Sequence, residues 1–196
     1  NGSIHIDSSF HNDAVTNGNG KYYVYKDWIN DSSFTPGSSH VYLYGDDQLI
    51  TGDSVTAFYD LTLQGTGIKT QMLNARTLNR LDLNNLELAL GNDSMFVHNP
   101  DTASVQYDKT FDAEGFVSTT ETGSLVRYAN TDGDYIFPLG SSQGTSRFRP
   151  VMIRPENTGS NVYSAGFLNY DANADAFIRS NSDNSICLTN GLYYHK

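Results

Sequence analysis

Apolar and polar residues alternate in short runs along residues 41–91, and each run ends in a small polar turn rich in Gly, Asn and Asp. Alternation with a period of two predicts strands that bury one face, and these turn residues accept the left-handed backbone of tight turns. Three of the runs are centred on Leu43, Leu63 and Leu83, which gives the pattern a period of about 20 residues. A fixed period of this length predicts a β-solenoid, in which each coil stacks its apolar residues on the coil before it.

A meander of evenly spaced hairpins is the alternative that the same pattern allows. Neighbouring segments extend the repeat in both directions. Val24 precedes Val41 by slightly less than one period, which fits an earlier and slightly shorter coil, and Phe116 follows Phe96 by one full period. Residues 22–91 therefore account for about four coils.

Apolar runs beyond residue 104 are irregularly spaced. Residues 124–128 and 135–139 flank the turn sequence NTDGD, which predicts a β-hairpin. Further strands are expected at residues 149–153, 163–168, 176–179 and 185–188. Because an open solenoid end exposes unpaired backbone, we expect these strands to cap it. The predicted fold is all-β, with a parallel β-solenoid-like region at residues 1–103 and an antiparallel β-sandwich-like capping module at residues 104–196.

The charge balance excludes one class of partner. The chain of 196 residues has 22 Asp and Glu against 12 Lys and Arg, which gives a net charge of −10. Electrostatic binding to nucleic acid needs clustered Lys and Arg, so no nucleic-acid partner is expected. No apolar run is long enough to span a membrane, and no signal peptide is present, so we expect a mature chain or an excised domain. The single cysteine, Cys187, says little about the compartment.

An acidic turn near the C-terminus offers a weak calcium site. Asp171, Asn173 and Asp175 follow the D-x-N-x-D spacing that opens a calcium loop. An EF-hand loop needs Gly at the sixth position and Glu at the twelfth, where this chain has Ala176 and Ser182. The structural alternative is a solvated turn. The five histidines show no metal-ligand spacing, and no other cofactor is expected.

One short motif resembles a hydrolase signature. Residues 140–144 read GSSQG, which matches the G-x-S-x-G pattern around Ser142. A nucleophile elbow needs a helix directly after the serine, whereas Pro150 and β-type residues follow here. We therefore expect a loop between strands and no enzymatic activity.

A cluster of aromatic residues is a candidate for stacking on polysaccharide. Tyr23, Tyr25 and Trp28 are its members. In a strand, Tyr23 and Tyr25 share one face, while Tyr22 and Val24 share the other. One of these faces must be core, so the alternative for part of the cluster is interior packing.

Several segments together resemble a recurring region of large cell-surface proteins of Bacteroidota, of the gliding-motility and type IX secretion kind. The likeness covers nearly the whole chain and is carried by their order and spacing. The segments are residues 27–30 (DWIN), 48–52, 58–71 (FYDLTLQGTGIKTQ), 95–100 (MFVHNP), 115–118, 135–142 (YIFPLGSS), 147–151 (RFRPV) and 193–195. The resemblance implies an exported, modular protein with an adhesive or structural role. It implies no catalytic residues.

O-glycosylation is a further hypothesis that this resemblance raises. Three triplets resemble the Asp-Ser/Thr-apolar acceptor used in Bacteroidota, and they place candidate glycans on Ser54, Ser94 and Thr102. Two of the three lie beside predicted turns, where a sugar projects into solvent.

The sequence as a whole favours an extracellular structural or adhesive domain at the cell surface. Self-association into a homopolymeric fibre is the partner hypothesis, with segments around Ile4 and residues 192–195 as the first candidates for the joint. The alternative is a carbohydrate-binding module of a larger secreted adhesin or enzyme, which would bind surface glycans.

Overall fold

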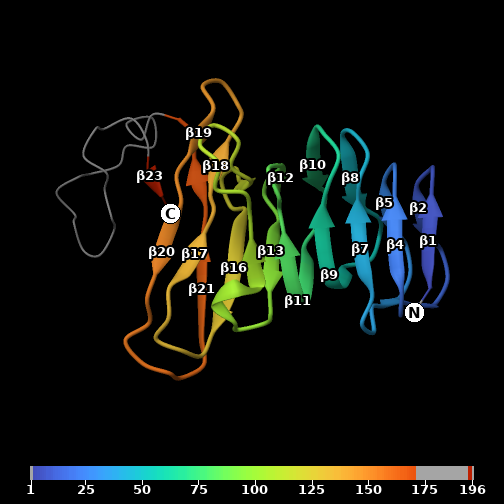
Figure 1. Ribbon diagram of the computed structural model, residues 1–196, viewed down its shortest axis with the longest axis horizontal. Helices are drawn as coiled ribbons and strands as arrows, with labels where there is room; N and C mark the ends of the chain where they lie inside the picture. The colour runs from blue at the N-terminus through green and yellow to red at the C-terminus, as the bar shows by residue number, and fades with distance from the viewer. Residues whose placement is uncertain (1, 171–193, 196) are drawn as a thin grey trace.

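The computed structural model describes residues 2–170 and 194–195, and in this part the chain is all-β apart from one short 3-10 helix, η1 (Thr102–Ser104). Residues 3–106 form a parallel β-solenoid of about five turns, as the period of the sequence predicts. The pairing is parallel from coil to coil, so the alternative of a hairpin meander is wrong. Figure 1 shows the coils stacked along the long axis of the molecule.

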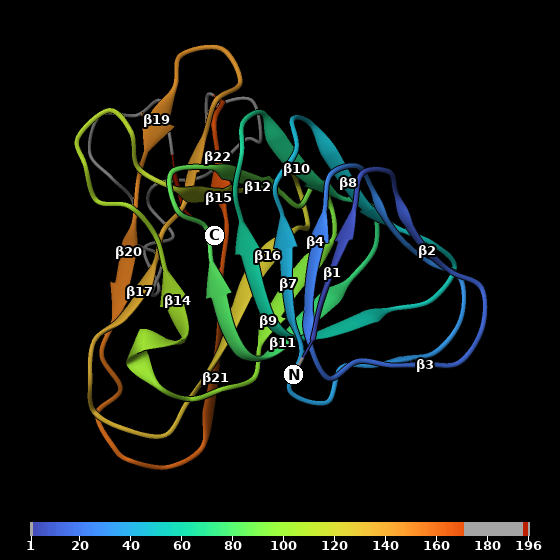
Figure 2. The same ribbon diagram turned by 45° about the vertical axis from the view of Figure 1, so that its right-hand side comes forward.

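Each coil contributes to three faces. The first face holds β1 (Ser3–Ile6), β4 (Lys21–Val24), β7 (His40–Leu43), the second halves of β9 (Thr56–Leu63) and β11 (Ala75–Asp82), and β14 (Val105–Gln106). The second face holds β2 (Phe10–Asn12), β5 (Trp28–Asn30), β8 (Gln48–Thr51), β10 (Ile68–Gln71), β12 (Glu87–Ala89) and β15 (Phe116–Ser118). The third face holds β3 (Thr16–Asn17), β6 (Phe34–Thr35), the first halves of β9 and β11, β13 (Ser94–Val97) and β16 (Ser124–Ala129). In Figure 2 the strands β1, β4 and β7 of the first face lie apart from β2, β8 and β10 of the second face.

The register of the first face explains the period in the sequence. Leu43 pairs with Leu63, which confirms the predicted spacing of the central coils. Ser3 pairs with Lys21, so the first coil is shorter than the central ones. Val24 pairs with Leu43 and not with Val41. The coil between these strands is therefore slightly shorter, as predicted, but the expected alignment of Val24 with Val41 is wrong.

The core is a set of columns that run along the stack. Inward positions of neighbouring coils carry the same kind of side chain, and each contributes about 1.5–3 kcal/mol on burial. Val41, Leu61 and Leu81 form one such column and are fully buried. Rings replace aliphatic chains in the first coils, where Trp28 stacks on Phe10 with ring centroids 4.2 Å apart. Stacking of similar side chains therefore determines which positions face the interior and how the strands of successive coils are aligned.

Aspartates in the turns explain part of the acidic composition. The Asp27 carboxylate accepts a hydrogen bond from the backbone N–H of Leu49, one coil further on, at 2.8 Å. The Asp47 carboxylate accepts one from the backbone N–H of Ile68 at the same distance. These bonds satisfy donors that the short strands leave unpaired at their ends. The acidic residues at these turns are thus structural.

The chain after residue 106 is built differently. It pairs four times in antiparallel fashion: β16 with β21 (Asn161–Ala165), β17 (Tyr135–Phe137) with β20 (Val151–Ile153), β18 (Gly140–Ser141) with β19 (Arg147–Phe148), and β22 (Phe167–Leu168) with β23 (Tyr194–His195). The predicted antiparallel character is confirmed. A sandwich of two facing sheets stays a prediction. The predicted hairpin of residues 124–128 with 135–139 is wrong, because β16 pairs with β21 instead.

The two regions share their sheets. β12 pairs in parallel with β15, and β13 pairs in parallel with β16, so the coil pattern crosses the predicted boundary at residue 103. Among residues 2–170 and 194–195, no helix is long and apolar enough to cross a membrane.

Candidate functional site

The outer surface of the first face carries a column of rings. His5, Tyr23 and Tyr42 occupy one register position in three successive coils. Their rings stack in parallel, with centroids 4.5 Å apart between His5 and Tyr23 and 4.6 Å apart between Tyr23 and Tyr42. His40 covers the Tyr42 ring at 4.0 Å. Since a sugar stacks on the face of a ring, and neighbours cover both faces of Tyr23, the predicted role of Tyr23 in sugar stacking is not favoured.

Tyr25 is the most exposed of the three predicted stacking residues, with 46% of its surface accessible. Its ring leans on that of Tyr44 with centroids 5.4 Å apart. The Tyr44 hydroxyl in turn donates a hydrogen bond to the Asp7 carboxylate at 3.2 Å. Tyr25 is therefore a single accessible ring beside the column and not part of a flat platform.

Trp28 lies inside the solenoid, so its predicted contact with a surface ligand is wrong. It is fully buried, and its indole N–H donates a hydrogen bond to the Thr56 hydroxyl at 3.2 Å. Trp28 and Asn30 share the inward side of β5, while Ile29 between them faces outward. An indole with its N–H satisfied in this way is a core residue.

His40 is a half-buried histidine beside the column of His5, Tyr23 and Tyr42. Its ring nitrogens lie 2.7 Å from the Thr62 hydroxyl and 3.1 Å from the Tyr42 hydroxyl. Burial lowers the pKa of His40 below its ordinary value, although the Asp60 carboxylate 3.9 Å away opposes this shift. Burial therefore favours the neutral form of the imidazole, which bonds to Thr62 on the next coil.

Two buried cations are held by backbone carbonyls, and the sequence pattern did not predict either of them. The Lys69 ammonium donates hydrogen bonds to the carbonyls of Gly45 at 2.8 Å and Thr66 at 2.9 Å, and also to that of Asp46. Burial lowers the pKa of Lys69 to about 8. The cage closes the turn between the first and second faces, so we interpret Lys69 as a structural group.

Arg127 has the equivalent role in the later region. Its guanidinium donates to the carbonyls of Ile136 at 2.6 Å and Thr102 at 2.9 Å, and it lies over the Tyr135 ring, 5.2 Å from the centroid. Burial lowers the pKa of Arg127 to about 10. Arg127 thereby ties η1 and β17 to the last solenoid strand of the third face.

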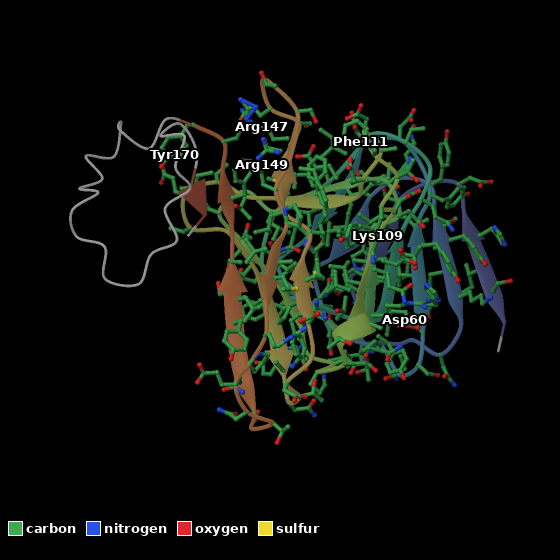
Figure 3. All side chains as sticks on the ribbon, turned by 60° about the vertical axis from the view of Figure 1, so that its left-hand side comes forward. Asp60, Lys109, Phe111, Arg147, Arg149 and Tyr170 are labelled. Carbon is green, nitrogen blue, oxygen red and sulfur yellow. The ribbon has the colours of Figure 1, made fainter. Side chains whose placement is uncertain are left out.

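A groove lies where the solenoid meets the later strands. It has a volume of about 610 Å³. Figure 3 shows Arg147 and Arg149 close together on the side of the molecule that also carries Phe111. The lining combines aromatic rings, two guanidinium groups and two carboxylates: Phe111, Asp112, Glu114, Phe116, Ser146, Arg147, Phe148 and Arg149. Arg147 and Arg149 lie far from Phe111 in the sequence, so only the fold brings these groups together.

The candidate glycan acceptors lie in three different settings. Ser54 is half-buried in the turn after β8, where its backbone bonds to Asn30. The Ser94 hydroxyl lies 3.0 Å from that of Ser124 on the next coil, so it already has a partner. Thr102 is half-buried in η1, and its carbonyl accepts from Arg127. Modification of all three stays a prediction.

The predicted calcium ligands Asp171, Asn173 and Asp175 lie outside the described residues, as does Cys187. Within residues 2–170, no group of three or more His, Cys, Asp or Glu side chains gathers in a way that could hold a metal ion. Ser142 lies in the turn between β18 and β19. A strand follows this turn, so the strand-to-helix elbow of a serine hydrolase is not formed.

Comparison with known proteins gives no relative on which to base an assignment, since no family model, curated protein or solved structure matches this chain.

Proposed function

We propose that this chain is an extracellular structural domain that assembles end to end into a surface fibre. One observation carries the proposal. In the nine-stranded set of paired strands, the path of pairing begins at β1 on the first face and ends at β21, which pairs with β16 of the third face, and β14 is a third strand with a single partner. β1 lies at one end of the long axis, and β21 lies in the later region toward the other end, with β17 and β20 beside it (Figure 1). A sheet with an edge toward each end of the molecule favours continuation of the sheet from one copy into the next.

The backbone of β1 is suited to accept another strand. The carbonyls of Gly2 and Ile6 bond to β4, so by alternation the N–H and C=O groups of Ser3 and His5 point away from the stack. Among the described residues, no strand pairs with this outer edge. Ile4 points toward the interior, yet it is half-exposed because no coil covers it. Another strand on β1 would satisfy the backbone and cover Ile4.

At the other end, β21 runs antiparallel to β16 and offers five residues. Its outer edge has no strand partner within residues 2–170 or 194–195. Val162, its second residue, is exposed. β21 pairs with a strand of the third face and β1 belongs to the first face, so pairing of β21 with β1 of another copy needs a rotation of that copy about the solenoid axis. Such a contact is heterologous, because two different surfaces meet in it. Each added copy offers a free surface to the next, so the copies assemble into a filament.

Columns along the stack support a load-bearing role. Rings outside and aliphatic chains inside repeat from coil to coil, so a force along the axis is shared by several backbone ladders and columns. The resemblance to Bacteroidota surface proteins supports an extracellular location. Of the two predicted joint segments, the one around Ile4 agrees with this proposal. Tyr194 and His195 pair with β22 of their own chain, which does not favour them as a joint.

Sedimentation velocity over a range of protein concentrations tests the joint. Ser3→Pro removes an edge N–H without removing a bond to β4, and proline on an edge strand blocks strand addition. We expect Ser3→Pro to sediment as a monomer, whereas the matched variant Ser3→Ala assembles like the natural chain. Equal assembly of Ser3→Pro and Ser3→Ala would overturn the role of β1.

A mixing experiment tests the head-to-tail geometry. Val162→Lys places a charge on the opposite edge and should also give monomers alone. Each variant keeps one intact end, so an equimolar mixture with Ser3→Pro should form dimers and stop there. A mixture that stays monomeric would contradict pairing between β1 and β21.

A further inference from the structure

A long insertion in the solenoid builds one wall of the groove at its C-terminal end. Ile68 pairs with Glu87, about one period further along the chain, whereas Glu87 pairs with Phe116, about one and a half periods further along. About half of the additional residues lie between β14 and β15, in a loop at positions 108–115. The loop is held by its own hydrogen bonds, because the Asp108 carboxylate accepts from the N–H and the hydroxyl of Thr110. The Asp108 N–H also donates to the Asn84 carbonyl, so the loop is tied to the preceding coil.

The tip of this loop presents a phenylalanine to solvent. Phe111 is 83% exposed, more than any other large apolar side chain of the described residues. Asp112 beside it has a φ of 61°, a left-handed conformation that turns the chain at the tip. An ordered loop that holds a phenyl ring in water contributes nothing to the stability of the core. Such a ring favours a role in contact with a ligand.

The opposite wall carries positive charge on an otherwise acidic chain. Arg147 and Arg149 lie in and directly after β19. Arg149 is exposed, and its guanidinium donates one hydrogen bond to the Phe148 carbonyl at 2.8 Å. Two arginines on one groove of a protein with a net charge of −10 favour an anionic ligand.

The floor of the groove depends on a glycine. A Cβ atom at Gly140 would lie 2.8 Å from Cγ of the Phe116 ring and 2.5 Å from the carbonyl oxygen of Arg147. Glycine therefore lets the Phe116 ring lie directly on β18. The ring closes the groove from below, between the loop that carries Phe111 and the hairpin that carries the arginines.

We propose that this groove binds a saccharide that carries a carboxylate group, a uronic acid. The exposed guanidinium of Arg149 has further N–H donors that match a carboxylate in planar, two-point hydrogen bonding, and Arg147 adds positive charge to the same wall. The Phe111 ring offers a face for the apolar side of a sugar ring. Asp112 and Glu114 accept hydrogen bonds from sugar hydroxyls. The same two carboxylates repel a polyphosphate, so the mixed lining favours a uronic acid, with one charge and several hydroxyls per ring.

Titration calorimetry with trigalacturonate tests the proposal, and its fully methyl-esterified form is the matched probe without charge. We expect binding of the acid and none of the ester. Arg149→Gln and Phe111→Ser, both at exposed positions, should each weaken binding at least tenfold. Arg154→Gln removes an exposed arginine outside the groove and should bind like the natural chain.

Absence of binding to millimolar trigalacturonate overturns the proposal. Equal binding of the acid and the ester, or unchanged binding by Arg149→Gln, also overturns it. Circular dichroism of each variant shows whether it keeps the fold. The outcome is independent of fibre assembly, because the Ser3 and Val162 variants leave the residues of the groove unchanged.

Discussion

The regular coils and the inserted segments of this chain use strands of the same solenoid in different ways. In the regular part, Ser3 pairs with Lys21 and Ala75 with Met95, so a coil is complete after about 20 residues. In the later region, Ser94 pairs with Ser124, so this coil is about half as long again. The regular coils use nearly every residue for a strand, a short turn or an inward column. The longer coil has additional residues, and it carries the loop of Phe111.

Rings and charged side chains therefore have different contacts in the two regions. Where the period is kept, rings and charges contact their equivalents on the next coil and stabilise the stack, as in the column of His5, Tyr23 and Tyr42. Where the period is broken, rings and charges have no equivalent to contact and line a groove. The repeat therefore provides the scaffold, and departures from the repeat are the first places to look for recognition.

The largest expected effect on the free energy of unfolding comes from removing a ring inside the solenoid, and a ring on its outer surface is the comparison. Trp28→Ala removes a fully buried indole that packs on Phe10, and it should lower the free energy of unfolding by about 3–5 kcal/mol. Tyr25→Ala, at a half-exposed ring of a neighbouring strand, should lower it by less than about 1 kcal/mol. Urea denaturation measures both. Equal losses would mean that the outer rings carry as much stability as the core.

The next effect concerns the link between the regular coils and the later region. Arg127→Met leaves the carbonyls of Thr102 and Ile136 without their donor, and it should cost about 2–4 kcal/mol. The loss comes from buried acceptors left unsatisfied. Arg154→Gln, which removes an exposed ion pair, should leave the unfolding midpoint unchanged within error. A midpoint for Arg127→Met equal to that of the natural chain would show that the carbonyl cage contributes nothing to the link.

A smaller effect depends on pH and tests the charge inside a regular coil. Burial lowers the pKa of Lys69 from 10.5 to about 8. Between these values the unfolded chain binds more protons than the folded chain, so this group makes stability rise with pH. Lys69→Met lacks this contribution, and the equivalent position of the next coil holds Leu88, so an apolar side chain fits there.

Urea denaturation at several pH values checks the prediction for Lys69. The stability of the natural chain relative to Lys69→Met should rise from pH 8 to pH 10, since other titrating groups are common to both proteins. A difference that does not change across this range would mean that the pKa of Lys69 keeps its ordinary value in the folded chain.

The solenoid was predictable because its signal is local and repeated. Leu43 and Leu63 alternate with polar neighbours, and their pairing follows from the period. Phe116 shows where this reasoning ends. It follows Phe96 by one period in sequence, yet it pairs with Glu87 on another face, because the inserted loop changes the phase of the coil.

The candidate sites were less predictable, for two physical reasons. Alternation predicts that Tyr22 and Tyr23 face opposite ways, which the structure confirms, but it does not say which side is the core, and Trp28 shares the inward side with Tyr22 and Val24. The groove has no local pattern at all. Phe111 and Arg149 are brought together by the insertion and by the β18–β19 hairpin, and neither leaves a periodic signal in the sequence.

Electron microscopy of the protein taken from its native surface tests the central claim most directly. The account predicts filaments with a regular axial repeat, in which one copy follows another along the solenoid axis. Dispersed single particles under the same conditions would contradict end-to-end assembly, and the two open edges of the sheet would then need another explanation.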